Sequence, residues 1–181
     1  MDELRAFADL DGRVALVTGC GSPDGIGFAT ARLLGRQGAK VAITSTTERI
    51  QERVAELGDE GITASGHVAD LTDPDEAARV VAETVEIHGG LDILVNNAGM
   101  SQVGTEDLGR PFAELSPEEW QAGIDRNLKL TANVTRAALA DITQAEGGRI
   151  VFVTSVTGPV VSAPGNPAYS AAKAGVDGLM R

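Results

Sequence analysis

Tyr169 and Lys173 have the residue types and the spacing that acid–base catalysis would use. They lie four positions apart in a predicted helix that starts at Asn166-Pro167, so both side chains share one helical face. A free tyrosine has a pKa of about 10 and is a poor base near neutral pH, but a neighbouring ammonium group favours the phenolate. The pair therefore predicts a tyrosine that serves as general acid and base. A solvated pair on a surface helix is the alternative interpretation.

The hydroxyl of Ser155 is a second candidate for this chemistry. It stands at the end of a predicted strand over 149–155. Ligands of parallel sheets bind beyond the carboxyl ends of the strands, so this end faces the same crevice as the Tyr169 helix. We therefore expect Ser155 to hold a substrate carbonyl oxygen, with Thr154 as the less favoured alternative.

The stretch 13–27 predicts a strand, a glycine turn and a helix start. Residues 14–17 form a short apolar, β-branched run, which is typical of a buried strand, and Gly25-Ile26-Gly27 then opens an alanine-rich helical stretch. Backbone N–H groups at such a helix start point at one spot, and glycines let a phosphate come close. A plain strand–helix turn is the alternative for the glycine pattern taken alone.

The elements that position these residues alternate along the chain. Strands are predicted at 13–18, 40–45, 63–68, 91–96 and 149–155, and helices at 25–37, from 50, at 73–88, at 116–144 and from 166 to the end, with a lead-in at 1–12 and a loop at about 99–115. Ile26, Ala29, Leu33 and Leu34 are expected to form the apolar face of the first helix. This alternation predicts an α/β fold, a doubly wound parallel sheet with helices on both faces in three αβα layers.

Composition narrows the classes of function. The chain has 181 residues and a formal net charge of -11, which suggests one domain and argues against a nucleic-acid partner. Cys20 is the single cysteine, so no internal disulfide forms, and this fits a reducing compartment. No apolar run approaches membrane-spanning length. We therefore expect a cytoplasmic protein without a membrane partner. His67 and His88 appear isolated in the sequence, so no metal site is expected.

Six motifs together resemble the short-chain dehydrogenase/reductase family, in its classical branch. They are TGCGSPDGIG at 18–27, VADLTD at 68–73, NNAG at 96–99, RNL around Asn127, TSVTG at 154–158 and YSAAK at 169–173. They occur in the order typical of the family and cover nearly the whole chain. The resemblance implies a Rossmann-like fold and hydride transfer between a nicotinamide cofactor and a carbonyl or secondary alcohol substrate.

The resemblance also implies a role for each candidate residue. Tyr169 would be the catalytic acid and base, and Lys173 would bind the nicotinamide ribose and lower the pKa of the tyrosine. Ser155 would orient the substrate, and Asn127 would hold a water that links Lys173 to solvent; an ordinary mid-helix polar residue is the alternative for Asn127. Cofactor contacts would come from Gly19, Gly25, Ile26 and Gly27 at the pyrophosphate, Asp70 and Leu71 at the adenine, and Asn97, Ala98 and Gly99 beside the cofactor.

The end of the second strand bears on the choice of cofactor. NAD-dependent enzymes need an acid there for the ribose 2′-hydroxyl, whereas this chain has hydroxyl residues at 44–47, among them Ser45 and Thr46. Small hydroxyls leave room for a 2′-phosphate, and Arg49 is near enough in sequence to help. NADP is therefore favoured, with NAD as the alternative; these hydroxyls could instead cap the next helix.

The stretch KVAITSTTE at 40–48 resembles the 3-oxoacyl-[acyl-carrier-protein] reductases within the family. This implies a small carbonyl or alcohol substrate, with a 3-oxoacyl thioester on an acyl carrier as one candidate. Arg126, Lys129 and Arg136 could give part of the basic patch that an acidic carrier needs; a solvated helix face is the alternative. The resemblance also implies a homodimer or homotetramer for the full-length parent.

The chain departs from the family pattern in three places. Five residues separate Gly19 from Gly25, so the turn must bulge. The interval from Ser155 to Tyr169 is slightly long. The sequence ends inside the catalytic helix, which implies a single dinucleotide-binding domain at 1–181 whose C-terminal portion is missing. A non-catalytic nucleotide-binding or interaction fragment is therefore the alternative function.

Overall fold

A five-stranded parallel sheet forms the centre of the computed structural model, which describes residues 9–99, 111–162 and 164–181. Its strands are β1 (Val14–Val17), β2 (Lys40–Ser45), β3 (Ala64–Val68), β4 (Ile93–Asn96) and β5 (Arg149–Phe152), in the spatial order β3-β2-β1-β4-β5. The strand order reverses at β1, whose neighbours β2 and β4 lie on opposite sides. In such sheets this reversal opens a crevice at the carboxyl ends of the strands.

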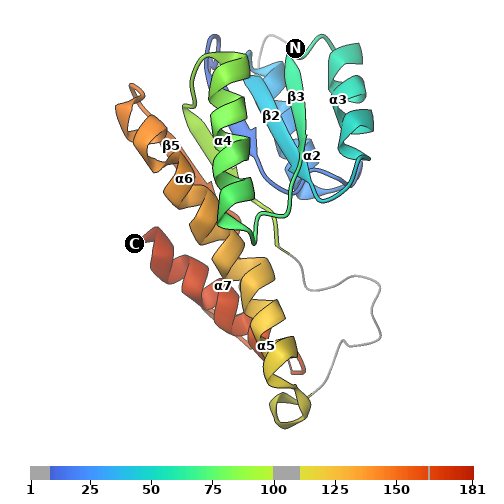
Figure 1. The fold of residues 1–181 in the computed structure, drawn as a ribbon, viewed down its shortest axis with the longest axis vertical. Helices are drawn as coiled ribbons and strands as arrows, with labels where there is room; N and C mark the ends of the chain where they lie inside the picture. Colours follow the sequence, from blue (N-terminus) through green and yellow to red (C-terminus); the bar gives the residue numbers. More distant parts are fainter. Residues whose placement is uncertain (1–8, 100–110, 163) are drawn as a thin grey trace.

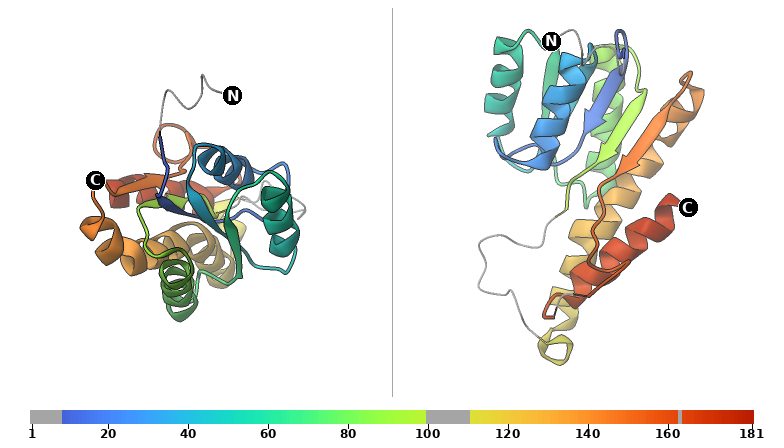
Figure 2. Two further views of the ribbon diagram at one scale, coloured as in Figure 1. Left: turned by 90° about the horizontal axis from the view of Figure 1, so that it is seen from above. Right: turned by 180° about the vertical axis from the view of Figure 1, so that it is seen from behind.

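Helices cover both faces of the sheet (Figures 1 and 2). They are α2 (Ile26–Arg36), α3 (Ile50–Asp59), α4 (Pro74–His88), the short 3-10 helix η1 (Phe112–Glu114), α5 (Pro117–Ile124), the π-helical turn η2 (Asp125–Lys129), α6 (Leu130–Gln144) and α7 (Pro167–Met180). Alternate residues of the central strands point to opposite sides, so Val17 and Ile43 pack with α2 and α3, whereas Leu16 and Leu94 pack with α4 and α6. The predicted Rossmann-like fold in three layers is confirmed.

Two helix starts follow the sequence signals that predict them. The Asp73 carboxylate caps α4 by accepting the N–H of Asp75 at 2.9 Å, and Pro74 occupies the first turn. Ser116 and Glu119 form a reciprocal capping box at the start of α5. Both caps satisfy backbone N–H groups that a helix start leaves without partners, which fixes where these helices begin.

The structure corrects three details of the predicted elements. The helix expected at 116–144 is interrupted by the π-helical turn η2. The last strand ends at Phe152 rather than at Ser155. In α2, Ile26 and Leu33 are 67% and 50% exposed, and the buried face is formed instead by Gly27, Phe28 and Ala31.

Figure 1 shows α5, η2 and α6 as one long rod that extends beyond the sheet, with α7 lying beside it. The contacts between elements agree with this view, because α7 packs more extensively against α5 and η2 than against β5. Parts of the predicted lead-in at 1–12 and of the loop at 99–115 lie outside the described residues. None of the helices described has the length and apolar character needed to cross a bilayer.

Candidate functional site

A cavity of about 590 Å³ lies at the carboxyl ends of β1 to β4, where the strand order reverses. Side chains and backbone from four strand ends, the start of α2, the η2 turn and α7 line it. The lining residues are Gly19, Gly21, Ser22, Gly25, Ile26, Thr44, Ser45, Thr46, Arg49, Ala69, Asp70, Leu71, Thr72, Asn97, Ala98, Gly99, Arg126, Leu130 and Tyr169.

Thr18 and Asn97 tie the ends of β1 and β4 together beneath this cavity. The Thr18 hydroxyl accepts the backbone N–H groups of Asn97 at 3.0 Å and Ala98 at 2.9 Å. In return, the Asn97 side-chain amide donates to the carbonyls of Thr18 at 2.9 Å and Gly19 at 3.1 Å. Two chain segments that are far apart in sequence are thereby held in one fixed register. Residues 97–99 therefore form a rigid floor.

Two glycines of the first turn are required by this close approach. Gly19 has a φ of 74°, and a Cβ there would lie 2.8 Å from the Cα of Ala98. A Cβ at Gly27 would lie 2.5 Å from the Asn97 amide nitrogen and 2.6 Å from the Gly19 carbonyl oxygen. Gly25 precedes the first residue of helix α2 and provides no side-chain cap, so the first N–H groups of the helix are available to an anion.

The extra residues of the glycine turn form an outward bulge, as the sequence predicts. Ser22, Pro23 and Asp24 are exposed, and the Gly25 N–H closes the turn on the Ser22 carbonyl at 3.2 Å. Cys20 lies beneath them, fully buried, with its N–H on the Thr44 carbonyl at 2.7 Å. Burial raises the pKa of the Cys20 thiol to about 12, so this cysteine is an unreactive packing residue.

The end of β2 brings hydroxyl groups and one guanidinium to the rim of the cavity. Ser45 and Thr46 line it. Arg49 lines it as well, although the sequence suggested for this residue only a supporting contact to a 2′-phosphate. A Cβ at Gly21 would lie 2.6 Å from both the Arg49 Nε and the Ser45 Oγ, so only a residue without a side chain leaves room for both groups here. Helix α3 has no side-chain cap, so the alternative in which these hydroxyls cap it is not observed.

Asp70, Leu71 and Thr72 form the wall of the cavity beyond β3. The Asp70 Oδ1 accepts the N–H of Thr72 at 3.0 Å and its hydroxyl at 2.8 Å. The Asn133 side chain, on α6, donates to the carbonyls of Leu71 and Thr72, both at 3.1 Å. This wall is therefore positioned from the helix layer as well as from the sheet.

Tyr169 reaches the cavity from α7, and Lys173 lies one turn further along. The Lys173 Nζ lies 5.7 Å from the centre of the Tyr169 ring and donates to the Val153 carbonyl at 2.9 Å. Lys173 is 4% exposed, and burial lowers the pKa of its ammonium group. A Cβ at Gly99 would lie 3.3 Å from the Lys173 Nζ and 2.9 Å from the Asn127 Oδ1, so the lysine and the asparagine approach the same glycine.

Asn127 lies in the π-helical turn η2 and is buried. Its side-chain amide nitrogen donates to the Gly123 backbone carbonyl at 3.0 Å, and its backbone carbonyl accepts from the Thr131 hydroxyl at 3.1 Å. A π-helical turn widens the helix and changes its carbonyl pattern, and such turns recur at functional sites. The sequence identified Asn127 but gave no signal of this wider turn.

Ser155 lies beyond the end of β5 and is not among the residues that line the cavity. Its hydroxyl accepts the Thr157 N–H at 3.0 Å. The neighbouring Thr154 hydroxyl donates to the Lys173 carbonyl at 3.1 Å and so holds α7. Of the predicted site residues, the cavity brings together Gly19, Gly25, Ile26, Ser45, Thr46, Asp70, Leu71, Asn97, Ala98, Gly99 and Tyr169, whereas Gly27, Asn127, Ser155 and Lys173 lie outside its lining.

Comparison with known proteins gives one family. A family model described as short chain dehydrogenase matches residues 13–181. Oxidoreductase UcpA of Salmonella typhimurium is 37% identical over 172 residues, which cover 95% of this chain and 62% of the relative. A protein of Streptomyces virginiae named as a ketoacyl reductase of the monensin polyketide synthase is 41% identical over 172 residues, which cover 93% of this chain and 62% of that relative. The chain thus spans less than two thirds of the length of these relatives.

Solved structures agree with the sequence relatives. Carveol dehydrogenase from Mycobacterium avium, in complex with NAD, matches with a TM-score of 0.85 and 31% identity, over 96% of this chain and 65% of that chain. A metagenomic short-chain oxidoreductase in complex with NADP matches with a TM-score of 0.85 and 36% identity, over 96% of this chain and 75% of that chain.

Replacing Gly27 by alanine tests the close packing of the first turn. The new methyl group would meet the Asn97 amide and the Gly19 carbonyl, so Gly27→Ala is expected to lower the free energy of unfolding by about 1–3 kcal/mol. Gly58→Ala, in α3, is the matched control because its added Cβ meets nothing within 4 Å. The control should be neutral or raise stability by about 0.5–1 kcal/mol in urea unfolding. Equal effects of both substitutions would contradict the packing described.

Proposed function

The chain belongs to the short-chain dehydrogenase family, and on that premise we propose that the protein is an NAD(P)-dependent oxidoreductase acting on a carbonyl or secondary alcohol. One observation carries the proposal: Tyr169, with Lys173 one turn away, lines the same cavity as the glycine turn and the 97–99 floor. An acid–base group and an anion-binding turn thus face one space, which is what hydride transfer from a dinucleotide requires.

The residues around the cavity fit a dinucleotide. Gly19, Gly21 and Gly27 keep backbone and side chains close where added Cβ atoms would collide, and the uncapped start of α2 offers N–H groups for a pyrophosphate. The Asp70 carboxylate at the far wall would meet an adenine amine, with Leu71 bordering it. These features support the proposed cofactor contacts of the glycine turn, including Gly25 and Ile26, and of residues 97–99.

The bound nicotinamide would supply the hydride, and the protein would supply position and proton transfer. In the proposed mechanism the Tyr169 phenol gives its proton to the substrate oxygen during reduction and takes it back during oxidation. Lys173, with its Nζ close to the tyrosine ring and to Gly99, would hold the nicotinamide ribose. Asn127 would support proton relay from the π-helical turn, and Ser155 is the residue proposed to orient the substrate.

NADP is the proposed cofactor, with NAD as the alternative. The Arg49 guanidinium and the Ser45 hydroxyl both approach Gly21 at the rim, where Thr46 also lines the cavity, and form a donor set suited to a 2′-phosphate. The solved relatives include one in complex with NAD and one in complex with NADP, so the proposal depends on the residues of this chain.

A 3-oxoacyl thioester on an acyl carrier is the finer substrate proposal. The relative named as a ketoacyl reductase supports it, as do the exposed basic residues Arg126, Lys129 and Arg136 along η2 and α6. We also propose a homodimer or homotetramer in the cytoplasm. The competing proposal is a non-catalytic nucleotide-binding fragment, favoured by the position of Ser155 outside the cavity lining.

Tyr169→Phe is the direct test of the proposed reaction. It removes only the hydroxyl, so turnover of a carbonyl and alcohol panel with NADPH should fall at least about a hundredfold, while the NADPH dissociation constant changes little. Retained turnover in this variant would contradict the role of Tyr169. Turnover that is absent in the unchanged protein, together with intact NADPH binding, would favour the non-catalytic alternative.

Arg49→Gln tests the cofactor proposal. Loss of the guanidinium should raise the NADPH dissociation constant about tenfold, which corresponds to about 1.4 kcal/mol, and leave the NADH constant unchanged. Arg36→Gln is the matched control because Arg36 pairs with Glu60 on the outer helices. An equal loss of NADPH and NADH affinity in Arg49→Gln would show that Arg49 does not read the 2′-phosphate.

A further inference from the structure

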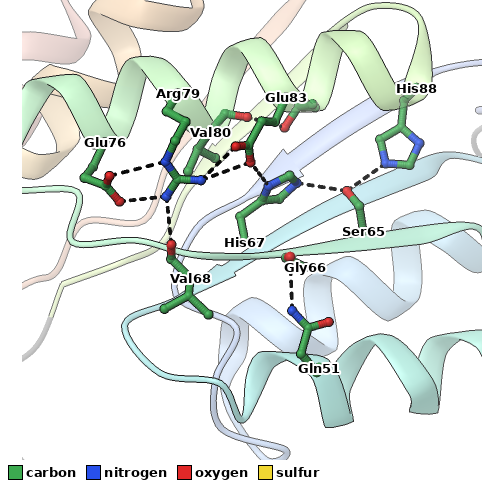
Figure 3. Close-up of polar contacts among 11 residues, drawn as sticks. Gln51, Ser65, Gly66, His67, Val68, Glu76, Arg79, Val80, Glu83 and His88 are labelled. Atoms are coloured by element: carbon green, nitrogen blue, oxygen red, sulfur yellow. Dashed lines mark hydrogen bonds and ion pairs between the residues drawn. The ribbon is translucent and has the colours of Figure 1, made fainter.

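A chain of polar side chains joins β3 to α4 outside the cavity (Figure 3). His67 and His88 have no partner at metal-ligand spacing in the sequence, but both contact Ser65 in the structure. The Ser65 hydroxyl lies 3.0 Å from the Nε2 of His67 and 2.9 Å from the Nε2 of His88. The other ring nitrogen of His67, Nδ1, lies 2.8 Å from the Glu83 Oε2. These four side chains therefore form one connected network.

The Glu83 carboxylate, at one end of this network, sets the direction of its hydrogen bonds. An ionised carboxylate only accepts, so the Nδ1 of His67 carries the hydrogen that it donates to Glu83. In the neutral ring the Nε2 is then an acceptor, which takes the Ser65 hydroxyl hydrogen. The Ser65 oxygen in turn accepts from the Nε2 of His88. The result is a one-way chain from His88 through Ser65 and His67 to Glu83, which fixes the orientation of the buried His67 ring.

Arg79 continues the network from Glu83. Its Nη1 lies 2.9 Å and 3.0 Å from the two oxygens of Glu83, and its Nη2 lies 2.6 Å from the Glu76 Oε2. The Arg79 bonds, and then His67, lower the pKa of the Glu83 carboxyl, so Glu83 stays ionised at neutral pH. Isolated surface ion pairs contribute little, but a guanidinium held by two carboxylates is already ordered before it makes another contact.

That further contact is with the backbone of β3. The Arg79 Nη2 donates to the Val68 carbonyl at 2.8 Å. The next residue, Ala69, donates its N–H to the Ser45 carbonyl of β2 at 3.0 Å. Because successive backbone groups of a strand point to opposite sides, the Val68 carbonyl faces the free edge of the sheet. Arg79 thus satisfies an acceptor at an edge where the described chain has no further strand.

Val68 leads directly into the cavity wall. Asp70, Leu71 and Thr72 follow it within four positions, and all three line the cavity. Asn133 holds the far end of this segment through the Leu71 and Thr72 carbonyls. Arg79 holds the other end of the segment through its hydrogen bond to the Val68 carbonyl. The segment 68–72 is therefore clamped from α4 at one end and from α6 at the other.

We propose that His67, Glu83 and Arg79 are positioning residues that set the 68–72 wall and thereby the affinity for the adenine half of a dinucleotide. None of the three lines the cavity, so they act on it through the Val68 carbonyl, which Arg79 holds two residues before Asp70. The inference rests on the proposed function, because it takes the ligand of that wall to be an adenine nucleotide. It assigns a binding role to a network between β3 and α4 that no catalytic step uses.

The test compares the two halves of the dinucleotide as separate probes. Glu83→Gln removes the charge that orients Arg79 and replaces one of the two oxygens that accept from Arg79 and His67 by an N–H donor. Arg79→Lys removes the forked donor that reaches Val68. Each variant should weaken ADP binding about fivefold in calorimetric titration and leave NMN binding unchanged. A network that only stabilises the fold would not separate the two probes.

Glu86→Gln is the matched control, because it makes the same charge change on an exposed residue of the same helix. It should bind both probes like the unchanged chain, and thermal unfolding of all variants shows that each is folded at the titration temperature. Equal ADP affinity in Glu83→Gln, Arg79→Lys and Glu86→Gln would overturn the inference, as would a parallel loss of ADP and NMN binding. If the unchanged chain binds neither probe, the proposed function itself fails.

Discussion

The tie between Thr18 and Asn97 is the interaction on which the rest of the site depends. It joins the carboxyl ends of β1 and β4, the two strands between which the sheet reverses its order. Because the backbone segments come so close, Gly19 and Gly27 have no space for a side chain. The start of α2 is consequently brought beside the 97–99 floor, and the cavity opens above both. A turn of this kind places backbone donors, rather than flexible side chains, where a phosphate would bind.

The acid–base side of the site depends on a second constraint, the burial of Lys173. Its ammonium group donates to the Val153 carbonyl, and the Thr154 hydroxyl donates to the Lys173 carbonyl, so α7 is tied to the segment that follows β5. The π-helical turn η2, which joins α5 to α6, brings Asn127 against Gly99, the glycine that Lys173 also approaches. Lys173 is buried beside Tyr169, so its charge is poorly solvated, and this burial lowers the pKa of its ammonium group. The two halves of the site thus meet at the 97–99 floor.

The fold and most of the cavity lining could be predicted from the sequence because they depend on local signals. Hydrophobic runs gave the strands, Asp73 and Ser116 gave two helix starts, and the glycine pattern gave the first turn. The predictions that failed concern features that tertiary packing determines. Ile26 has the apolar spacing of a buried residue but is exposed because it lines the cavity. The π-helical turn has no composition of its own, and the contact between His67 and His88 passes through Ser65, which no sequence spacing indicates.

If the strand ends around Thr18 and Asn97 form a dinucleotide site, the chain must bind nicotinamide cofactors. The chain is titrated with NADPH and with NADH while the fluorescence of the bound nicotinamide is followed. We expect saturable binding of both, with NADPH bound more tightly because of Arg49 and Ser45. Tighter binding of NADH would contradict the assignment of those residues to a 2′-phosphate. No binding of either cofactor would show that these strand ends do not form a dinucleotide site.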